Sequence, residues 1–217
     1  MSIAGNVQML IKLDCREGDL YRACQKRLAA DPRGLFKGIR LSSEQLTLGD
    51  VAICADDATL LLLVERKTLP DLAASLADGR YAEQGHRLQE CSLDNGSVAY
   101  LIEGSLAHYR PRPGGIPRST LVSAMASLWR GKGFCVHRTG SVDESAEWLM
   151  CLGRWMVKDA ERPARPATNY SHVAKRAKTA SVTKGNVEQI MLSQVPGVSP
   201  AVAAALLEHT NGLATLL

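Results

Sequence analysis

Short apolar runs alternate with amphipathic segments along the first 160 residues. Short apolar runs bounded by turn residues are typical of buried strands, whereas apolar residues spaced three and four apart are typical of helices. The pattern predicts strands at 9–14, 36–41, 46–54, 59–66, 97–103 and 134–138, and helices at 20–30, in a short stretch after Thr68, and at 81–90, 119–129 and 143–158. This alternation predicts an α/β fold, with a mixed central sheet flanked by helices.

The pattern changes after this region. Residues 161–185 are polar, with prolines first and a basic cluster later, which predicts a flexible basic linker. In 186–217 two apolar segments flank Pro196-Gly197, which predicts a helix, a tight hairpin and a second helix. The chain therefore divides into a domain at 1–160, the linker, and a small all-α helix-hairpin-helix element.

Charge and composition narrow the class of protein. Hydrophobic residues make up 46% of the chain, enough for a globular core. The net charge is +4, and the excess falls late: from Glu161 onward six basic residues face three acids, against 20 and 19 before it. A mild basic excess favours a polyanionic partner.

Other classes of protein are disfavoured. No apolar run approaches about 18 residues, so we expect no membrane span. The first residues lack the pattern of a secretory signal. The six cysteines show no C-x-x-C spacing, which favours reduced thiols in an intracellular protein over a disulfide framework or a zinc site.

The candidate chemistry lies where the apolar run 60–64 ends on Glu65-Arg66-Lys67. Side chains alternate along a strand, so Glu65 and Lys67 share one face. Asp50 opens the preceding apolar segment, and an antiparallel hairpin between the two strands would bring it to Glu65. Two acids and a lysine at a sheet edge suit metal-dependent hydrolysis of a phosphodiester. The alternative is an exposed strand end with ordinary solvated charges.

The motifs around this triplet carry a family resemblance. They are Gly49-Asp50, Val64-Glu65-Arg66-Lys67-x-x-x-Asp71, Ser75-x-x-Asp78-Gly79-Arg80-Tyr81-x-Glu83-Gln84, Arg87-Leu88, and later Ser119-Thr120-Leu121, Gly133-Phe134, Arg138-Thr139 and Glu144-Ser145-Ala146. From about residue 8 to 158 the sequence resembles the XPF-type structure-specific endonucleases. It is most similar to their MUS branch, the catalytic subunits of crossover-junction endonucleases.

The resemblance implies a restriction-endonuclease-like fold and a Mg²⁺-dependent endodeoxyribonuclease, in which Mn²⁺ substitutes for Mg²⁺. It implies that Asp50, Glu65 and Asp14 bind the metal. Lys67 is expected to orient the water or to stabilise the transition state. Arg66 is expected to contact a phosphate or to brace the acids.

Further residues are given roles by the resemblance. Asp71 is implied to have a metal-linked role, whereas its position three residues after Thr68 predicts a helix cap. Arg80, Gln84 and Arg87 are expected to face the DNA backbone, and the alternative is a solvated helix face.

The C-terminal element is similar to a DNA-binding helix-hairpin-helix. Gly197 permits the tight turn, and Ser199 opens a helix whose first amides are free to bind a phosphate. The alternative is a generic helical hairpin. The chain carries one hairpin where relatives pair two, and it does not show the N-terminal domains of the cellular subunits; a second hairpin beyond Leu217 in a longer natural chain stays open.

The expected substrate is branched double-stranded DNA, such as 3′ flaps, replication forks and nicked or intact Holliday junctions, in repair or recombination. A non-catalytic DNA-binding subunit of a heterodimeric nuclease is the alternative, and a sequence-specific restriction-type enzyme would not explain the hairpin. The expected location is intracellular, and nuclear in a eukaryote or for a virus that replicates in the nucleus.

Assembly is predicted from an excess of apolar surface. The helices at 119–129 and 143–158 contain all three tryptophans of the chain and more large apolar residues than one core-facing stripe requires. They predict an interface, either of a homodimer or of a heterodimer. The alternative is that these tryptophans lie in the core of the same chain.

Overall fold

The structure is a computed structural model that describes residues 7–56, 58–162, 183, 185–210 and 212–213. The chain divides into two compact units, Met1–Glu161 and Arg162–Leu217, and each is described by itself. The predicted flexible linker at 161–185 lies almost entirely outside the described residues.

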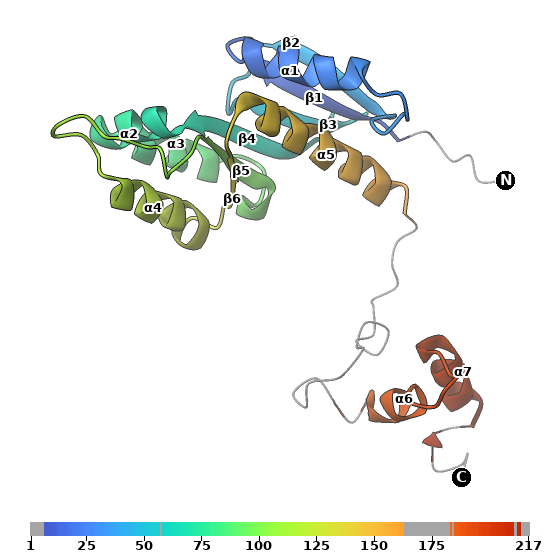
Figure 1. Cartoon of the computed structure of the whole chain (residues 1–217). Coiled ribbons are helices and arrows are strands. Elements are labelled where there is room, and N and C mark those ends of the chain that lie inside the picture. Colours follow the sequence, from blue (N-terminus) through green and yellow to red (C-terminus); the bar gives the residue numbers. More distant parts are fainter. Residues whose placement is uncertain (1–6, 57, 163–182, 184, 211, 214–217) are drawn as a thin grey trace. The chain divides into compact units, whose positions relative to one another are not determined.

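A six-stranded sheet organises the larger unit (Figure 1). The strands are β1 (Met9–Asp14), β2 (Ile39–Glu44), β3 (Val51–Ala55), β4 (Leu60–Thr68), β5 (Val98–Glu103) and β6 (Cys135–Thr139), in the order β2-β1-β3-β4-β5-β6. β1 pairs with β2 in parallel and with β3 antiparallel, and β3 and β4 form an antiparallel hairpin. β4, β5 and β6 are parallel. The predicted mixed sheet is confirmed.

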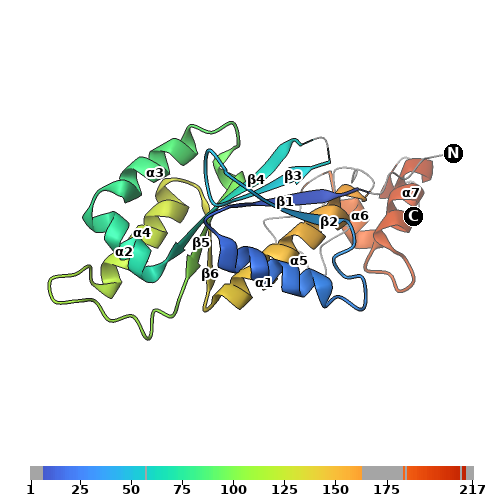
Figure 2. The ribbon, with the colours of Figure 1, turned by 90° about the horizontal axis from the view of Figure 1, so that it is seen from above.

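Helices cover both faces of this sheet (Figure 2). α1 (Gly18–Ala29) and α5 (Val142–Ala160) bury apolar residues against one face. α2 (Leu69–Ala77), α3 (Arg80–Gln89) and α4 (Arg118–Ala126) cover the other face. Because side chains alternate along β4, Val64 belongs to the first core and Leu63 to the second. The sheet therefore separates two apolar cores, and each residue of β4 faces only one of them.

Two predicted strands begin later than the apolar pattern indicated. The stretch before β3, predicted as strand from residue 46, is a loop, and the N–H of Leu46 donates to Oδ2 of Asp14 at 2.9 Å. The second strand begins at Ile39 rather than at residue 36, because the Asp31 carboxylate accepts from the N–H groups of Leu35 and Phe36 at 2.8 and 2.7 Å and holds them in a turn. Both errors come from side-chain contacts to the backbone, which compete with strand pairing.

The remaining elements deviate by a few residues or in helix type. A short 3₁₀ turn, η1 (Asn95–Ser97), precedes β5. The predicted helix at 119–129 is α-helical only to Ala126 and then continues as a π-helical segment, η2 (Ser127–Gly131). The predicted helix at 143–158 extends at both ends into α5, where Ser141 caps it by accepting from the N–H of Glu144.

The smaller unit holds the predicted helix, hairpin and helix. α6 (Val187–Leu192) and α7 (Pro200–Thr210) are joined by a turn in which Gly197 has φ +89°, a conformation that favours glycine. Oγ of Ser199 accepts from the N–H of Val202 at 3.3 Å and so begins α7. The Gln189 amide nitrogen donates to the Pro200 carbonyl oxygen at 2.9 Å, which ties the two helices together.

Candidate active site

The β3–β4 hairpin brings Asp50 to the end of β4. Val51 pairs with Val64, so Asp50 stands opposite Glu65. The N–H of Asp50 donates to the Val64 carbonyl at 2.8 Å, and Oδ2 of Asp50 accepts from the N–H of Arg66 at 2.8 Å. The backbone of β4 therefore holds this carboxylate directly.

The turn into Asp50 requires a glycine. Gly49 has φ +70°, and a Cβ at this position would lie 2.9 Å from Cδ1 of Leu63 and 3.1 Å from the Val64 carbonyl oxygen. A larger residue here would push the loop away from β4. Gly49 therefore permits the close approach that places Asp50 at the site.

Glu65 and Lys67 lie on the same face of β4, as the alternation predicts. Each is 7% exposed, and Nζ of Lys67 lies 3.4 Å from Oε1 of Glu65. Lys67 also donates to Oε1 of Gln84 on α3 at 2.8 Å. The ammonium group is thereby fixed between an acid of the sheet and an amide of the covering helix.

A cavity of about 520 Å³ opens over these groups. It is lined by Cys15, Arg16, Gln45, Leu46, Thr47, Leu48, Gly49, Asp50, Glu65, Gln84, Arg87 and Leu88. Its surroundings are mostly polar, and two arginines, Arg16 and Arg87, line it together with the two acids. A charged group with several oxygen atoms, such as a phosphate, matches this distribution of charge.

The two acids of the cavity are electrostatically strained. Burial raises the pKa of Asp50 to about 6, and the nearby Glu65 carboxylate contributes to the rise. Burial also raises the pKa of Glu65, although Lys67 opposes this rise. Without a bound cation, ionising both Asp50 and Glu65 costs free energy, because they are removed from water and their charges repel. A bound cation would lower this cost.

The donor set fits a hard divalent cation. Mg²⁺ prefers oxygen ligands, and it commonly uses one or two carboxylates while it keeps several waters or substrate oxygens. Asp50 and Glu65 supply such a pair in a cavity large enough for water. Among the described residues no group of three His, Cys, Asp or Glu side chains is close enough to share a metal, so Asp14 is not gathered with the other two acids.

Asp14 instead holds two loops together. It is fully buried, and its Oδ1 accepts from the backbone N–H of Arg16 at 3.0 Å and from the guanidinium of Arg16 at 2.6 Å. Oδ2 accepts from the N–H of Leu46. The Arg16 guanidinium and these amides hold the pKa of Asp14 well below its usual range. The acid therefore stays charged and fixes Arg16 at the rim of the cavity.

Arg66 faces the opposite side of the sheet from its two neighbours. Its guanidinium pairs with Glu17 at 2.6 Å and with Glu103 at 2.9 Å, and a second hydrogen bond to Glu103 measures 3.1 Å. All three side chains are at most 15% exposed. Glu103 also accepts from the hydroxyl of Ser145 on α5 at 2.7 Å. Of the two expected roles for Arg66, the geometry supports the brace, which fastens the end of β4 to α1, β5 and α5.

Comparisons with known proteins agree with this geometry. The model of the ERCC4 domain matches residues 26–152, more than half of the chain. The chain belongs to the ERCC4 family. The matched residues include Asp50, Glu65 and Lys67, so most of the cavity lining lies within the match, and Cys15 and Arg16 precede it.

Individual relatives place the chain within this family. It is 34% identical over 183 residues to the structure-specific endonuclease subunit MUS81 of Rattus norvegicus, covering 71% of this chain and 32% of that protein. It is 30% identical over 123 residues to the ERCC4 domain-containing protein EP364R of African swine fever virus, covering 56% of this chain and 34% of that protein. The chain therefore spans about a third of the length of the curated relatives that it matches. The resemblance to the MUS branch is confirmed.

A solved relative shares the ERCC4 fold. XPF from Aeropyrum pernix superposes with a TM-score of 0.51 at 23% identity, covering 93% of this chain and 81% of that chain. The predicted fold class is confirmed. No helix among the described residues is long and apolar enough to cross a membrane.

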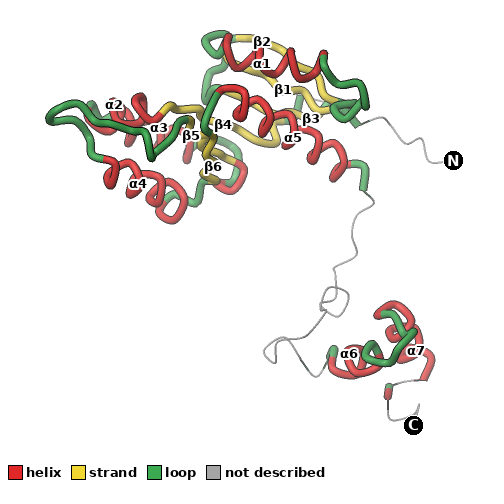
Figure 3. The backbone as a smooth tube through the Cα atoms, viewed as in Figure 1, coloured by secondary structure: helices red, strands yellow, loops and turns green. Residues whose placement is uncertain are grey.

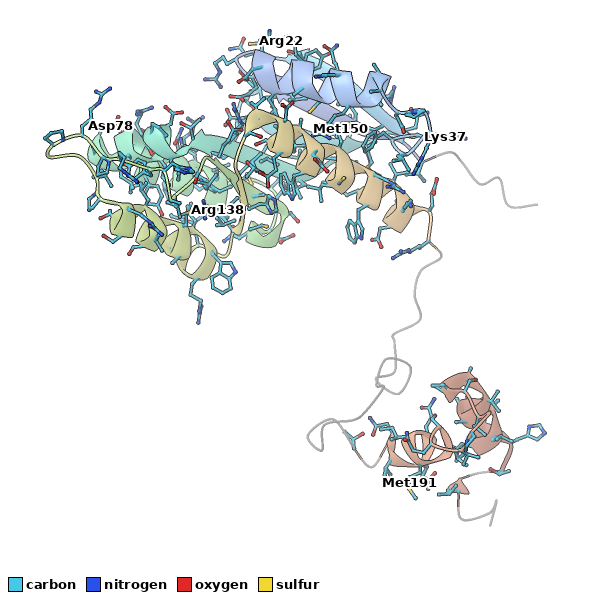
Figure 4. The ribbon with its side chains drawn as sticks, viewed as in Figure 1. Arg22, Lys37, Asp78, Arg138, Met150 and Met191 are labelled. Atoms are coloured by element: carbon cyan, nitrogen blue, oxygen red, sulfur yellow. The ribbon has the colours of Figure 1, made fainter. Side chains whose placement is uncertain are left out.

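Other predicted residues of the ERCC4 domain lie at varied distances from the cavity. Arg87 and Gln84 line it, and Arg87 donates to the Thr47 carbonyl at 3.3 Å. Arg80 does not line it and pairs with Asp78 at 2.7 Å, at the C-terminal end of α2, where Figure 4 labels Asp78. Asp71 lies outside the cavity too.

Asp71 takes part in the helix cap that the sequence also predicted. Its N–H donates to Oγ1 of Thr68 at 3.2 Å, and the Thr68 hydroxyl donates to its carboxylate at 2.5 Å. The geometry therefore favours capping over a metal-linked role.

The sequence interpretation missed two residues beside the acids. Tyr100 is paired in register with Glu65, is fully buried, and its hydroxyl makes no hydrogen bond within the described part of the chain. Cys15 is exposed and lines the cavity. Tyr100 sits within an ordinary apolar run, and only the register of β4 and β5 shows that it adjoins Glu65.

Proposed function

We propose that this chain is the catalytic nuclease part of a structure-specific endonuclease, which hydrolyses phosphodiester bonds in branched DNA with Mg²⁺ or Mn²⁺ held by Asp50 and Glu65. The observation that carries the proposal is the pair of opposed acids, Glu65 buried and Asp50 half-buried, beside Lys67 in an open polar cavity. The names of the MUS81 relatives support the class of reaction. Branched DNA, such as flaps, forks and junctions, is the substrate class that fits those names.

Different residues of the cavity are proposed to bind the metal and to stabilise the negative charge that builds up on the phosphate. If Asp50 and Glu65 hold Mg²⁺, its positive charge would favour ionisation of a water and offset charge on the phosphate oxygens. Lys67 is held by Glu65 and Gln84, so its ammonium is placed in advance to donate to a phosphate oxygen as negative charge builds there. The water oxygen forms a bond to phosphorus while the bond to the leaving oxygen breaks; the water releases a proton to solvent, and the leaving oxygen takes one up from solvent.

Arg16 and Arg87 are proposed to position the DNA phosphates. Arg16 is fixed by Asp14 although its side chain is 73% exposed, and Arg87 is fixed by the Thr47 carbonyl. Such exposed but oriented guanidinium groups suit the phosphates on either side of the cleaved bond. Contacts to phosphate carry no sequence information, which fits an enzyme that selects DNA by its shape.

The test compares charge removal at the site with charge removal elsewhere. Asp50→Asn and Glu65→Gln keep the side-chain shapes and should each lower cleavage of fluorescent flaps, forks and nicked junctions by more than a hundredfold at saturating Mg²⁺. Asp56→Asn is the control, because Asp56 is exposed and pairs with Arg40 away from the cavity. Cleavage within tenfold of wild type for the two site variants would contradict the assignment.

The same assay separates the two classes of subunit. A non-catalytic subunit would bind these substrates and cleave none of them. The complete set of Asp50, Glu65 and Lys67 favours the catalytic subunit, because a purely binding subunit has no need to hold two mutually repelling acids side by side.

The proposal includes a dimer through residues 119–158. Fewer apolar residues of this region are exposed for an interface than the sequence indicated. Leu121, Met125, Leu128, Leu149 and Met150 are buried in the cores of the chain itself. Trp129 on η2 is 66% exposed and Trp155 on α5 is 56% exposed. These two tryptophans support an interface, whereas Trp148 stacks on His137 with ring centroids 4.6 Å apart.

Light scattering tests the interface. If the chain forms a homodimer, Trp129→Ser should raise the dimer dissociation constant by at least about tenfold, because a buried tryptophan is commonly a dominant contact. A wild-type chain that is monomeric at tens of micromolar would contradict the homodimer and leave the heterodimer. The intracellular or nuclear location stays a prediction.

The helix-hairpin-helix is proposed to bind the DNA backbone through backbone amides near Gly197 and Ser199, although the N–H of Val198 already donates to the Val195 carbonyl at 3.0 Å and Pro200 has no N–H. The positive φ of Gly197 and the helix start at Ser199 support this role.

A further inference from the structure

A second cavity of the larger unit lies between α2 and the loop 104–117. Its volume is about 830 Å³, larger than that of the candidate active site. The long loop between β5 and α4, drawn in green in Figure 3, forms one wall, and the outer face of α2 forms the other. We call this cavity the α2–loop groove.

The loop wall is held by its own hydrogen bonds. The Tyr109 hydroxyl donates to the Ile116 carbonyl at 2.9 Å, and the N–H of Gly115 donates to the Arg112 carbonyl at 2.8 Å. The Arg110 guanidinium donates to the Ala107 carbonyl at 2.8 Å. Because the loop folds on itself in this way, the groove is formed before any ligand arrives, which lowers the entropic cost of binding.

The inner surface of the groove is apolar. α2 contributes Leu69, Ala73, Ala74 and Ala77, and the loop contributes the ring of Tyr109. Small alanines on one wall and an aromatic ring on the other leave room for a flat apolar group. A nucleic-acid base presents such a face whatever its identity.

The charge at the rim is positive. His108, Arg110 and Arg112 are exposed and line the groove, and none of them forms an ion pair among the described residues. The acid of the rim, Asp71, is already hydrogen-bonded to Thr68. Guanidinium groups that face no acid, over an apolar floor, match a chain of bases joined by phosphates better than they match an uncharged peptide.

The groove begins close to the candidate active site along the chain. Lys67 reaches the catalytic cavity through Gln84, and Leu69, two residues further on, lines the groove. The two cavities are therefore neighbours along the chain, which favours one DNA strand with a phosphate in the cavity and its next nucleotides in the groove.

We propose that the α2–loop groove binds the unpaired strand of a branched DNA substrate, with bases on the apolar floor and phosphates at Arg110 and Arg112. This inference rests on the proposed function and adds to it a subsite for single-stranded DNA. It explains how an enzyme without base-specific contacts distinguishes a flap from a plain duplex: the flap supplies an unpaired strand that the groove can hold.

The experiment measures binding without cleavage. In EDTA, the full chain is titrated into a fluorescent duplex with a 3′ flap of about eight thymidines, a length within the usual site sizes, and into the same duplex without the flap. The variants are Ala74→Trp, which fills the groove from an exposed position, and Arg112→Gln, whose side chain makes no hydrogen bond or ion pair within the described residues. The controls are Ala29→Trp and Arg33→Gln, at exposed positions of the opposite face.

The flap should strengthen DNA binding by the wild type. Ala74→Trp should weaken binding of the flapped duplex by at least about fivefold, since one stacked base contributes this much affinity or more. Arg112→Gln should reduce the salt slope of flap binding by about 0.7, the value for one phosphate contact on a single strand. The controls should behave as wild type. Equal binding of the flapped and plain duplexes, or site variants that bind the flap as the wild type does, would overturn the proposal.

Two further measurements, of peptide binding and of cleavage, distinguish the groove proposal from a protein-binding groove and from the proposed nuclease activity. An acidic peptide that binds the wild type but not Ala74→Trp, without competition from a thymidine octamer, would assign the groove to a protein partner and overturn the proposal. Mg²⁺-dependent cleavage of the flapped duplex is scored separately. If the wild type cleaves the flapped duplex but the groove variants bind the flap as the wild type does, only the groove proposal fails. If flap binding depends on the groove but no cleavage occurs, only the proposed nuclease activity fails.

Discussion

Asp50→Asn should make the protein more stable while it removes the proposed nuclease activity. Burial and the neighbouring Glu65 raise the pKa of Asp50 from its ordinary 3.8 to about 6. A shift of this size corresponds to about 3 kcal/mol, which the folded state loses when Asp50 ionises at neutral pH. Solvent in the open cavity screens part of this cost, so about 3 kcal/mol is the upper bound. Asparagine avoids the charge, and its side-chain oxygen can keep the hydrogen bond from the N–H of Arg66.

The sign of the pH dependence follows from the direction of the shift. The folded protein holds the Asp50 proton more tightly than the unfolded chain does, so the wild type loses stability as pH rises from about 4 to about 6. The variant lacks this group and lacks this loss. The gap between the two proteins should therefore be small near pH 4 and reach its full size above about pH 7.

Thermal unfolding followed by circular dichroism in EDTA measures this gap. At about 2–4 °C per kcal/mol for a domain of this size, Asp50→Asn should raise the Tm by up to about 10 °C at pH 8. Adding Mg²⁺ should raise the Tm of the wild type and leave that of the variant nearly unchanged. Asp56→Asn controls for the loss of an exposed charge. A variant no more stable than wild type at pH 8 would show that the two acids do not strain the fold.

Three other predictions follow from contacts at the site and in the smaller unit. Arg66→Met should cost about 3–5 kcal/mol of unfolding free energy in a urea titration, because it strands two buried carboxylates; Arg40→Met, which breaks an exposed pair, should cost less than about 1 kcal/mol. A bulky maleimide should block cleavage by reacting with Cys15 in the cavity, and Cys15→Ala should keep its activity under the same treatment; equal inhibition of both proteins would place the reactive thiol elsewhere. Deletion of 186–217 should weaken binding to branched DNA and lower its salt dependence, and unchanged affinity at physiological salt would contradict a role for the hairpin in binding.

The sequence predicts most of the fold and the centre of the site, because both depend on short-range patterns. Alternation along one strand places Glu65 and Lys67 on a common face, and a simple hairpin brings Asp50 to them. The role of Asp14 was not predictable in this way. Its carboxylate binds the N–H of Leu46, 32 residues away, and neither residue carries a local signal of that contact.

Apolar periodicity has a related limit. It identifies helices with much apolar surface, but it cannot divide that surface between a core and an interface. In the helix predicted at 119–129, Leu128 is fully buried and its neighbour Trp129 is 66% exposed. Which of the two faces the core depends on the local change to π-helical geometry, which shifts the side chains around the axis.

The hydrogen bonds of Asp50 also favour the native register of β3 and β4. The β3–β4 hairpin contains an irregularity between Ile53 and Cys54, so the turn alone does not dictate which residues face each other. A slip of one residue in β4 would send Arg66 into the cavity that Asp50 lines and bury Glu65 among the apolar residues beneath α1 and α5. Asp50 accepts from the N–H of Arg66 only in the correct alignment. A chain that has paired its strands wrongly therefore lacks both this hydrogen bond and the grouping of Asp50, Glu65 and Lys67, so it loses stability and the proposed site together.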